Sequence, residues 1–307
     1  MRHPDYPFTP RAFVREGLKQ SYLDEGQGAP VLMLHGNPSW SFYYRHLVLG
    51  LRERWRCVVP DHIGMGLSDK PDDEHYPFTL ERRVEDLDAL MAHLRVKRGL
   101  PEQGLTLVLH DWGGMIGMAW AERNPGRVSR LVILNTAAFP NPRGRRIPLA
   151  LRLGRDSRVG AWTILEHNAF ARGAARFGVR TPMPPEVRAA YLAPYDTPAH
   201  RLATLRFVQD IPLRPGEPGY DLVARTGAGL DRYAGLPALV CWGMRDFVFD
   251  RPFLREWRRR LPQAEVHEFA DAGHYVLEDA HARIVPLVRD FLERHPVVEA
   301  APALAPG

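Results

Sequence analysis

The segment Leu107-Val108-Leu109-His110-Asp111-Trp112-Gly113-Gly114 decides the architecture of this chain. An apolar run with strand character passes through one charged position, Asp111, directly into an amphipathic run that extends to about Arg123. This order predicts a strand, a sharp turn and a helix. The two glycines allow a tight backbone path and close packing of the helix against the strand. We therefore expect Asp111 at a strand end, beside a helix N-terminus whose partial positive charge favours an anion.

The rest of the chain repeats this alternation of strands and helices. Further strands are predicted at residues 31–34, 56–60, 130–134, 238–242 and 264–269, and helices at 79–96, 253–260 and 281–293. Such alternation predicts an α/β fold with a mostly parallel sheet and helices on both faces. The alternation breaks between residues 137 and 228, a Pro- and Arg-rich stretch without a convincing strand. We expect a helical cap insertion there, over the carboxyl ends of the strands, where open α/β sheets bind ligands.

The predicted domain organisation is a core over residues 1–136, a helical cap over 137–228, the second part of the core over 229–294 and a disordered Ala/Pro-rich tail over 295–307. With 307 residues, 45% hydrophobic and 25% charged, the composition is typical of a globular enzyme and excludes a disordered chain. Cys57 and Cys241 are too few for a disulfide framework or a zinc site, and we expect both to be buried. No signal-peptide pattern and no membrane-spanning apolar run is apparent, so a cytoplasmic protein without a transmembrane segment is expected.

The net charge of +5 is unevenly distributed, since residues 139–225 hold 14 Arg against 7 Asp and Glu. The arginines are scattered and no nucleic-acid motif accompanies them, so no nucleic-acid partner is expected. An arginine-rich solvated surface is the favoured interpretation, and an acidic docking partner or a lipid surface remains open.

Asp111 occupies the position at which an α/β hydrolase places its nucleophile, most familiarly a serine. A carboxylate is ionised at neutral pH and needs no base to activate it. It can attack an sp3 carbon to form an alkyl ester, or a strained carbonyl. A helix N-cap is the alternative role for this residue.

The motif His35-Gly36-Asn37-Pro38 follows the strand at 31–34. In this fold the backbone N–H groups of Asn37 and Trp112 are expected to form an anion hole. Their side chains add the Asn37 amide and the Trp112 indole N–H. Together these donors are expected to hold a halide, carboxylate or alkoxide that develops beside Asp111.

A histidine base and an acid that orients it complete the predicted site. His274 follows the last strand, where the fold places its general base, whereas His35 and His110 are expected to be structural. Asp246 follows the strand at 238–242 and is the predicted orienting acid. Asp250 is the less favoured alternative, because it precedes Arg-Pro and looks like a helix N-cap.

Three motifs in this order resemble the haloalkane-dehalogenase branch of the α/β-hydrolase fold: His-Gly-Asn-Pro at 35–38, His-Asp-Trp-Gly-Gly at 110–114 and Gly-His-Tyr at 273–275. The resemblance extends over roughly residues 10–293. It implies Asp111 as nucleophile, His274 as acid/base, Asp246 as the acid that orients it, and Asn37 with Trp112 as the anion-stabilising pair. Neither a cofactor nor a metal is expected.

The stretches 59–71, 135–140 and 273–279 are similar to the β-lactone decarboxylases of bacterial long-chain olefin biosynthesis. This resemblance implies that a cis-β-lactone with two long alkyl chains becomes a cis-olefin and CO2. It also implies a multi-enzyme assembly with a thiolase-like enzyme, a reductase and a β-lactone synthetase. Whether Asp111 attacks the carbonyl or the ring carbon stays open.

Three alternatives remain. A haloalkane dehalogenase that works through an alkyl-enzyme ester would use every residue named above. An epoxide hydrolase usually needs two cap tyrosines as donors, but Tyr191 and Tyr195 lie four residues apart and are expected to pack on the core. A non-catalytic α/β-hydrolase that only binds a ligand would not need a buried nucleophile and base.

Overall fold

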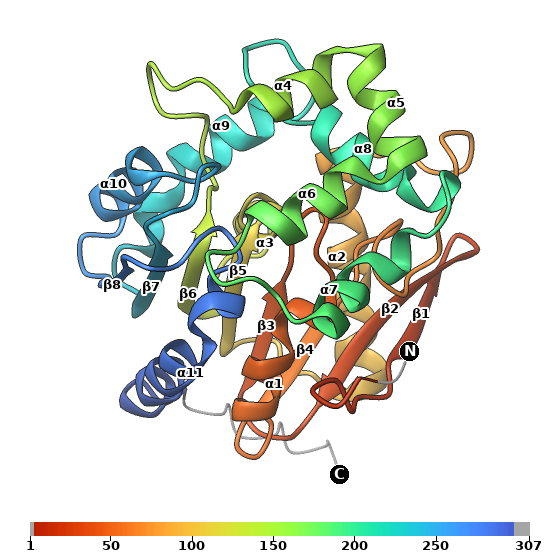
Figure 1. The fold of residues 1–307 in the computed structure, drawn as a ribbon. Coiled ribbons are helices and arrows are strands. Elements are labelled where there is room, and N and C mark those ends of the chain that lie inside the picture. The colour runs from red at the N-terminus through yellow and green to blue at the C-terminus, as the bar shows by residue number, and fades with distance from the viewer. Residues whose placement is uncertain (1–2, 298–307) are drawn as a thin grey trace.

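The computed structural model describes residues 3–297 and contains an eight-stranded sheet of order β1-β2-β4-β3-β5-β6-β7-β8 (Figure 1). The strands are β1 (Arg11–Arg15), β2 (Leu18–Glu25), β3 (Pro30–Leu34), β4 (Arg56–Pro60), β5 (Leu105–Asp111), β6 (Val128–Thr136), β7 (Ala238–Gly243) and β8 (Glu265–Phe269). β2 pairs antiparallel with β1 and β4, and the other pairings are parallel. The predicted mostly parallel sheet is thus confirmed. Beyond Val297, the predicted tail lies outside the described residues.

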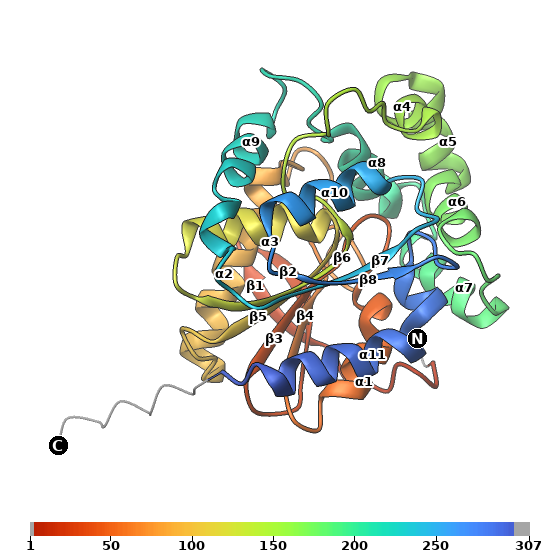
Figure 2. The ribbon, with the colours of Figure 1, turned by 90° about the vertical axis from the view of Figure 1, so that its left-hand side faces the viewer.

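Helices cover both faces of the sheet. They are α1 (Arg45–Leu51), α2 (Leu80–Arg98), α3 (Trp112–Arg123), α4 (Leu149–Asp156), α5 (Arg158–His167), α6 (Ala169–Phe177), α7 (Pro185–Leu192), α8 (Leu202–Gln209), α9 (Tyr220–Ala228), α10 (Arg251–Arg260) and α11 (Val276–Arg294). Figure 2 shows α1 and α11 on one face, with α3 and α10 on the other. Within residues 3–297, no helix combines the length and the apolar character that a membrane crossing requires.

Successive side chains of the central strands pack into two hydrophobic layers, one on each face of the sheet. Leu107 packs in the layer beneath α2 and α3, whereas its neighbour Val108 packs in the layer beneath α1 and α11. Successive side chains of a strand point to opposite faces, so buried strands need apolar residues at every position. Cys57 and Cys241 are buried in the second layer, as expected.

The sequence pattern did not predict the N-terminal hairpin of β1 and β2. Its turn is formed by Glu16 and Gly17, both at positive φ (52° and 80°), as two-residue hairpin turns require. β1 is an edge strand with largely exposed side chains, and β2 has a largely polar sequence, so neither has the buried apolar run that marks β3 to β7. α11 also begins at Val276 rather than at 281, with a non-helical residue, Ala280, near its start.

The strand order places the expected ligand site. β4 and β5 flank β3 on opposite sides, so the winding of the sheet reverses beside β3. Open α/β sheets bind ligands in the crevice outside the strand ends at such a reversal. Asn37 follows β3 and Asp111 ends β5, which places both residues at this crevice. Helices α4 to α9 fall within the predicted cap segment 137–228, and Figure 1 shows α4, α5, α6 and α8 above this end of the sheet; the cap boundaries stay a prediction.

Candidate active site

The turn between β5 and α3 holds Asp111 in an uncommon backbone conformation, with φ 51° and ψ −125°. Non-glycine residues rarely adopt positive φ, and such exceptions often lie at functional sites. The following residues explain the tight turn, since a Cβ at Gly113 would overlap the carbonyl oxygen of Leu34 and one at Gly114 would overlap the Thr136 hydroxyl. The helix therefore starts immediately after Asp111, and the Asp111 side chain lies at the end of the sheet.

The Asp111 carboxylate is buried and held by backbone donors. The Asn37 N–H donates to Asp111 Oδ1 over 2.7 Å, and the neighbouring Trp112 N–H favours the same negative charge. Burial raises the pKa of Asp111, and the positive charge of His274 together with the two N–H donors offsets this only in part. The Asn37 N–H, one of the two backbone donors expected to hold a ligand anion, thus bonds Asp111 itself. Oδ2 remains, 3.7 Å from His274 Nε2, as the oxygen that a ligand can meet.

The structure brings the predicted acid and base together. Asp246, in the loop after β7, accepts a hydrogen bond from His274 Nδ1 over 2.9 Å. Burial would lower the pKa of His274, but the Asp246 and Asp111 carboxylates outweigh it, so the pKa is raised. His110 is fully buried, and its Nε2 lies 2.9 Å from the carbonyl oxygen of His274, which suits the structural role expected of it. Asp250 instead pairs with Arg145 over 3.0 Å.

Cap and core side chains position the two side-chain donors. Asn37 Nδ2 donates to the carbonyl of Thr204 in α8 over 2.9 Å, which leaves its second N–H for a ligand. The Trp112 ring packs edge-on against Phe207 of α8, and the Arg83 guanidinium lies 5.2 Å from its centre. Thr204, Phe207 and Arg83 were not predicted, because they meet the site only through contacts between segments far apart in the chain.

A cavity of about 670 Å³ lies over these groups. Asn37, Asp111, Trp112 and His274 line its inner end. Its walls are mainly apolar side chains of core and cap, among them Met115, Phe139, Ile164, Phe170, Val208, Val223 and Phe249. This arrangement suits a long apolar ligand that presents one polar group to Asp111. Residues 3–297 contain no cluster of three His, Cys, Asp or Glu side chains able to hold a metal ion.

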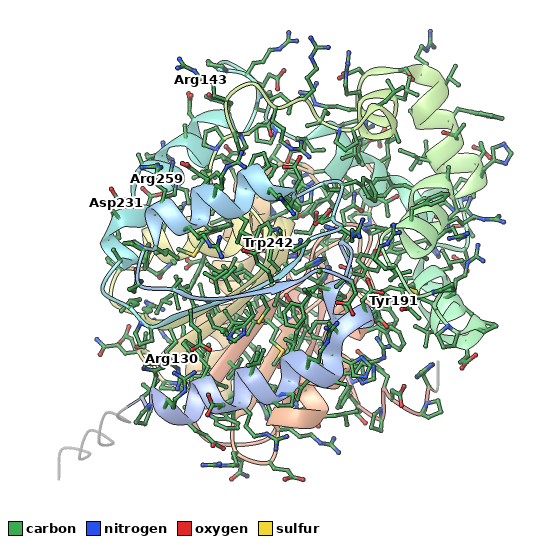
Figure 3. All side chains as sticks on the ribbon, turned by 60° about the vertical axis from the view of Figure 1, so that its left-hand side comes forward. Arg130, Arg143, Tyr191, Asp231, Trp242 and Arg259 are labelled. Carbon is green, nitrogen blue, oxygen red and sulfur yellow. The ribbon has the colours of Figure 1, made fainter. Side chains whose placement is uncertain are left out.

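The cap tyrosines lie away from this cavity. Figure 3 shows Tyr191 beside α11, where its hydroxyl donates to Glu278 over 2.5 Å. The Tyr195 hydroxyl lies 3.8 Å from the Met65 sulfur, and neither these two tyrosines nor Tyr220 lines the cavity. The pair of tyrosine donors that epoxide opening usually needs is therefore missing from the described part of the site.

Comparisons with known proteins agree with this geometry. Residues 29–281 match the model of a family described as alpha/beta hydrolase fold. A cis-3-alkyl-4-alkyloxetan-2-one decarboxylase of Xanthomonas campestris is 52% identical over 305 residues, which cover 97% of this chain and 100% of that protein. Haloalkane dehalogenase 2 of Mycobacterium bovis is 32% identical, with 92% and 94% covered. The crystal structure of the haloalkane dehalogenase DatA from Agrobacterium tumefaciens superposes with a TM-score of 0.84 at 26% identity, with 96% and 100% covered.

Proposed function

This chain belongs to the α/β hydrolase fold family, and from that premise we propose that it decarboxylates cis-3-alkyl-4-alkyloxetan-2-ones, β-lactones with two alkyl chains. The products are a cis-alkene and CO2. The observation that carries this proposal is the 52% identity to the Xanthomonas campestris decarboxylase over nearly the whole chain, against 32% to the Mycobacterium bovis dehalogenase. The apolar cavity of about 670 Å³ above the Asp111 carboxylate fits such a substrate.

In the first proposed step, Asp111 Oδ2 attacks C4 of the lactone, the alkyl-bearing ring carbon that is bonded to the ring oxygen. The bond between this carbon and the ring oxygen breaks. The ring oxygen becomes part of a carboxylate that stays attached to the neighbouring carbon. The hydrogen bond from the Asn37 N–H to Asp111 Oδ1 supports attack on C4, because attack on the carbonyl would need that same donor for the new oxyanion. The leaving carboxylate meets the side-chain N–H groups of Asn37 and Trp112 instead.

In the second proposed step, the bond to the carboxylate carbon breaks and CO2 leaves. The freed electron pair forms the carbon–carbon double bond, and the Asp111 carboxylate departs unchanged. Inversion in the first step followed by anti departure in the second gives the cis-alkene, and no water is consumed. His274, oriented by Asp246, places positive charge beside the departing Asp111 oxygen at 3.7 Å.

Haloalkane dehalogenation is the second candidate, favoured by the dehalogenase relatives and by their similar structures. Asp111 would displace a halide held by Asn37 and Trp112, and His274 would activate water to hydrolyse the ester. A purely binding role has less support, because binding alone does not require the buried carboxylates of Asp111 and Asp246 on either side of His274.

Product analysis separates these candidates. The purified chain is incubated with a synthetic dialkyl cis-β-lactone and, separately, with short bromoalkanes. We expect cis-alkene and CO2 from the lactone and little bromide from the bromoalkanes. An incubation without enzyme controls for spontaneous loss of CO2. Rapid bromide release with no alkene above this control would contradict the proposal and favour dehalogenation.

We further propose that the chain works in the cytoplasm within an assembly that contains a thiolase-like enzyme, a reductase and a β-lactone synthetase. The similarity of stretches 59–71, 135–140 and 273–279 to olefin-pathway decarboxylases supports this proposal. The chemistry also requires a supplier, since a strained four-membered lactone must be made by a ring-closing reaction.

A further inference from the structure

Exposed apolar side chains gather at one end of the cap. Nine large hydrophobic side chains of the described chain are exposed, and six of them lie on α4, α5, the end of α6 or the loop after β7. We call these six the apolar rim: Leu149, Leu153, Val159, Trp162, Phe177 and Phe247. Each is at least 47% exposed. Single exposed apolar residues are ordinary, but a gathered set indicates an interaction surface.

Four side chains of the apolar rim lie at the mouth of the active-site cavity, and the other two, Leu149 and Trp162, are on the same helices, α4 and α5. Leu153, Val159, Phe177 and Phe247 line the cavity and are at the same time exposed. The cavity therefore opens to the outside between these side chains. Figures 1 and 2 show α4 and α5 at the outer corner of the cap, far from the sheet. A ligand that enters here meets apolar side chains until it reaches Asp111.

Arginines without carboxylate partners flank the same mouth. Arg145 pairs with Asp250 and Arg155 with Glu217, but other arginines of this region form no ion pair within residues 3–297. These exposed arginines are Arg143, Arg146, Arg152, Arg158, Arg172 and Arg176. Figure 3 shows Arg143 pointing away from the molecule. The mouth thus combines an exposed apolar surface with uncompensated positive charge.

We propose that the apolar rim and these arginines dock the cap onto an anionic lipid bilayer, so that a dialkyl substrate passes from the membrane into the cavity. The identity of that substrate rests on the proposed function. Apolar and aromatic side chains insert at the boundary between headgroups and acyl chains, while guanidinium groups bind lipid phosphates. The free arginines complement an anionic surface, which favours lipid over a partner that offers only an apolar patch.

Vesicle flotation with the full chain, in the absence of substrate, tests the docking directly. We expect binding to phosphatidylcholine vesicles that contain phosphatidylglycerol, weak binding to phosphatidylcholine alone, and weakening at high salt. Leu149→Ser with Trp162→Ser is expected to lower partitioning about tenfold or more, because apolar area no longer inserts. Arg152→Gln with Arg158→Gln is expected to lower binding to the anionic vesicles about tenfold.

The matched control is Val14→Ser with Val96→Ser, which removes two exposed side chains far from the cap and is expected to change nothing. Leu149→Ser with Trp162→Ser is also expected to lower turnover of a dialkyl lactone held in anionic vesicles, while turnover of a short water-soluble lactone stays unchanged. Neither residue lines the cavity.

No binding to anionic vesicles, or equal binding by all variants, would overturn the proposal. If the Leu149→Ser, Trp162→Ser variant instead loses self-association or a complex with another protein, the mouth is a protein interface and the lipid proposal fails. Because vesicle binding is measured without turnover, it stands or falls separately from the proposed decarboxylation.

Discussion

Replacing Asp111 with asparagine is expected to lower kcat for a dialkyl cis-β-lactone by at least about 10⁴-fold, because an amide oxygen is a poor nucleophile. The fold is expected to persist, since asparagine has the same shape and tolerates the positive φ at this position. Burial raises the pKa of Asp111, so its charged form destabilises the native state at neutral pH. The variant is therefore expected to keep or raise the Tm.

Single-turnover kinetics and thermal unfolding test this expectation on the same samples. The mass of the peptide that carries position 111 must be checked, because hydrolysis of the new amide would restore the carboxylate. Asp61→Asn is a matched control, because Asp61 is buried but does not line the cavity. Burial raises the pKa of Asp61 as well, but both of its oxygens accept backbone N–H groups, from Ser41 and Leu67. An amide nitrogen would face one of these donors, so this variant is expected to have a lower Tm with little change in kcat. Turnover by Asp111→Asn close to the wild-type rate would contradict a covalent role for Asp111.

Trp112→Phe is expected to lower kcat about 10²–10³-fold, the usual effect of losing one donor aimed at a developing anion. Phenylalanine keeps an aromatic ring against Phe207, so most of the packing remains. Trp120→Phe is the control on the same helix, because its indole donates to Asp88 over 2.9 Å and lies outside the cavity. The control is expected to lose stability and to keep its kcat. Equal losses of kcat in the two variants would show that Trp112 acts only through packing.

Most of the strands and the site positions followed from the sequence because they depend on local patterns. Short apolar runs predicted the six strands β3 to β8, and the strand-to-helix switch at Asp111 predicted the turn. The carboxyl ends of parallel strands meet at one edge of the sheet, so residues that follow different strands were expected to lie close together. The structure places Asp246 against His274 in this way. Their catalytic roles stay a prediction.

The remaining features depend on packing between distant segments. Nothing local marks Thr204 or Phe207 as neighbours of Asn37 and Trp112, because α8 meets the core only through the tertiary fold. The sequence also did not show that the Asn37 N–H meets Asp111, because only the three-dimensional position of Asp111 Oδ1, 2.7 Å away, reveals this contact. The anion-stabilising role of Asn37 stays a prediction. The motif around Asn37 predicts a donor for an anion, but it does not specify whether that anion is a ligand or the Asp111 carboxylate.

The fate of the ring oxygen tests most directly the claim that the lactone opens at its alkyl-bearing ring carbon and not at its carbonyl. A dialkyl cis-β-lactone labelled with ¹⁸O at the ring position is turned over by the wild-type chain, and the CO2 is analysed by mass spectrometry at early times, before exchange with water. Attack on the ring carbon sends the labelled oxygen into CO2. Unlabelled CO2, with the label released as water, would mean that Asp111 attacks the carbonyl and would contradict the proposed mechanism.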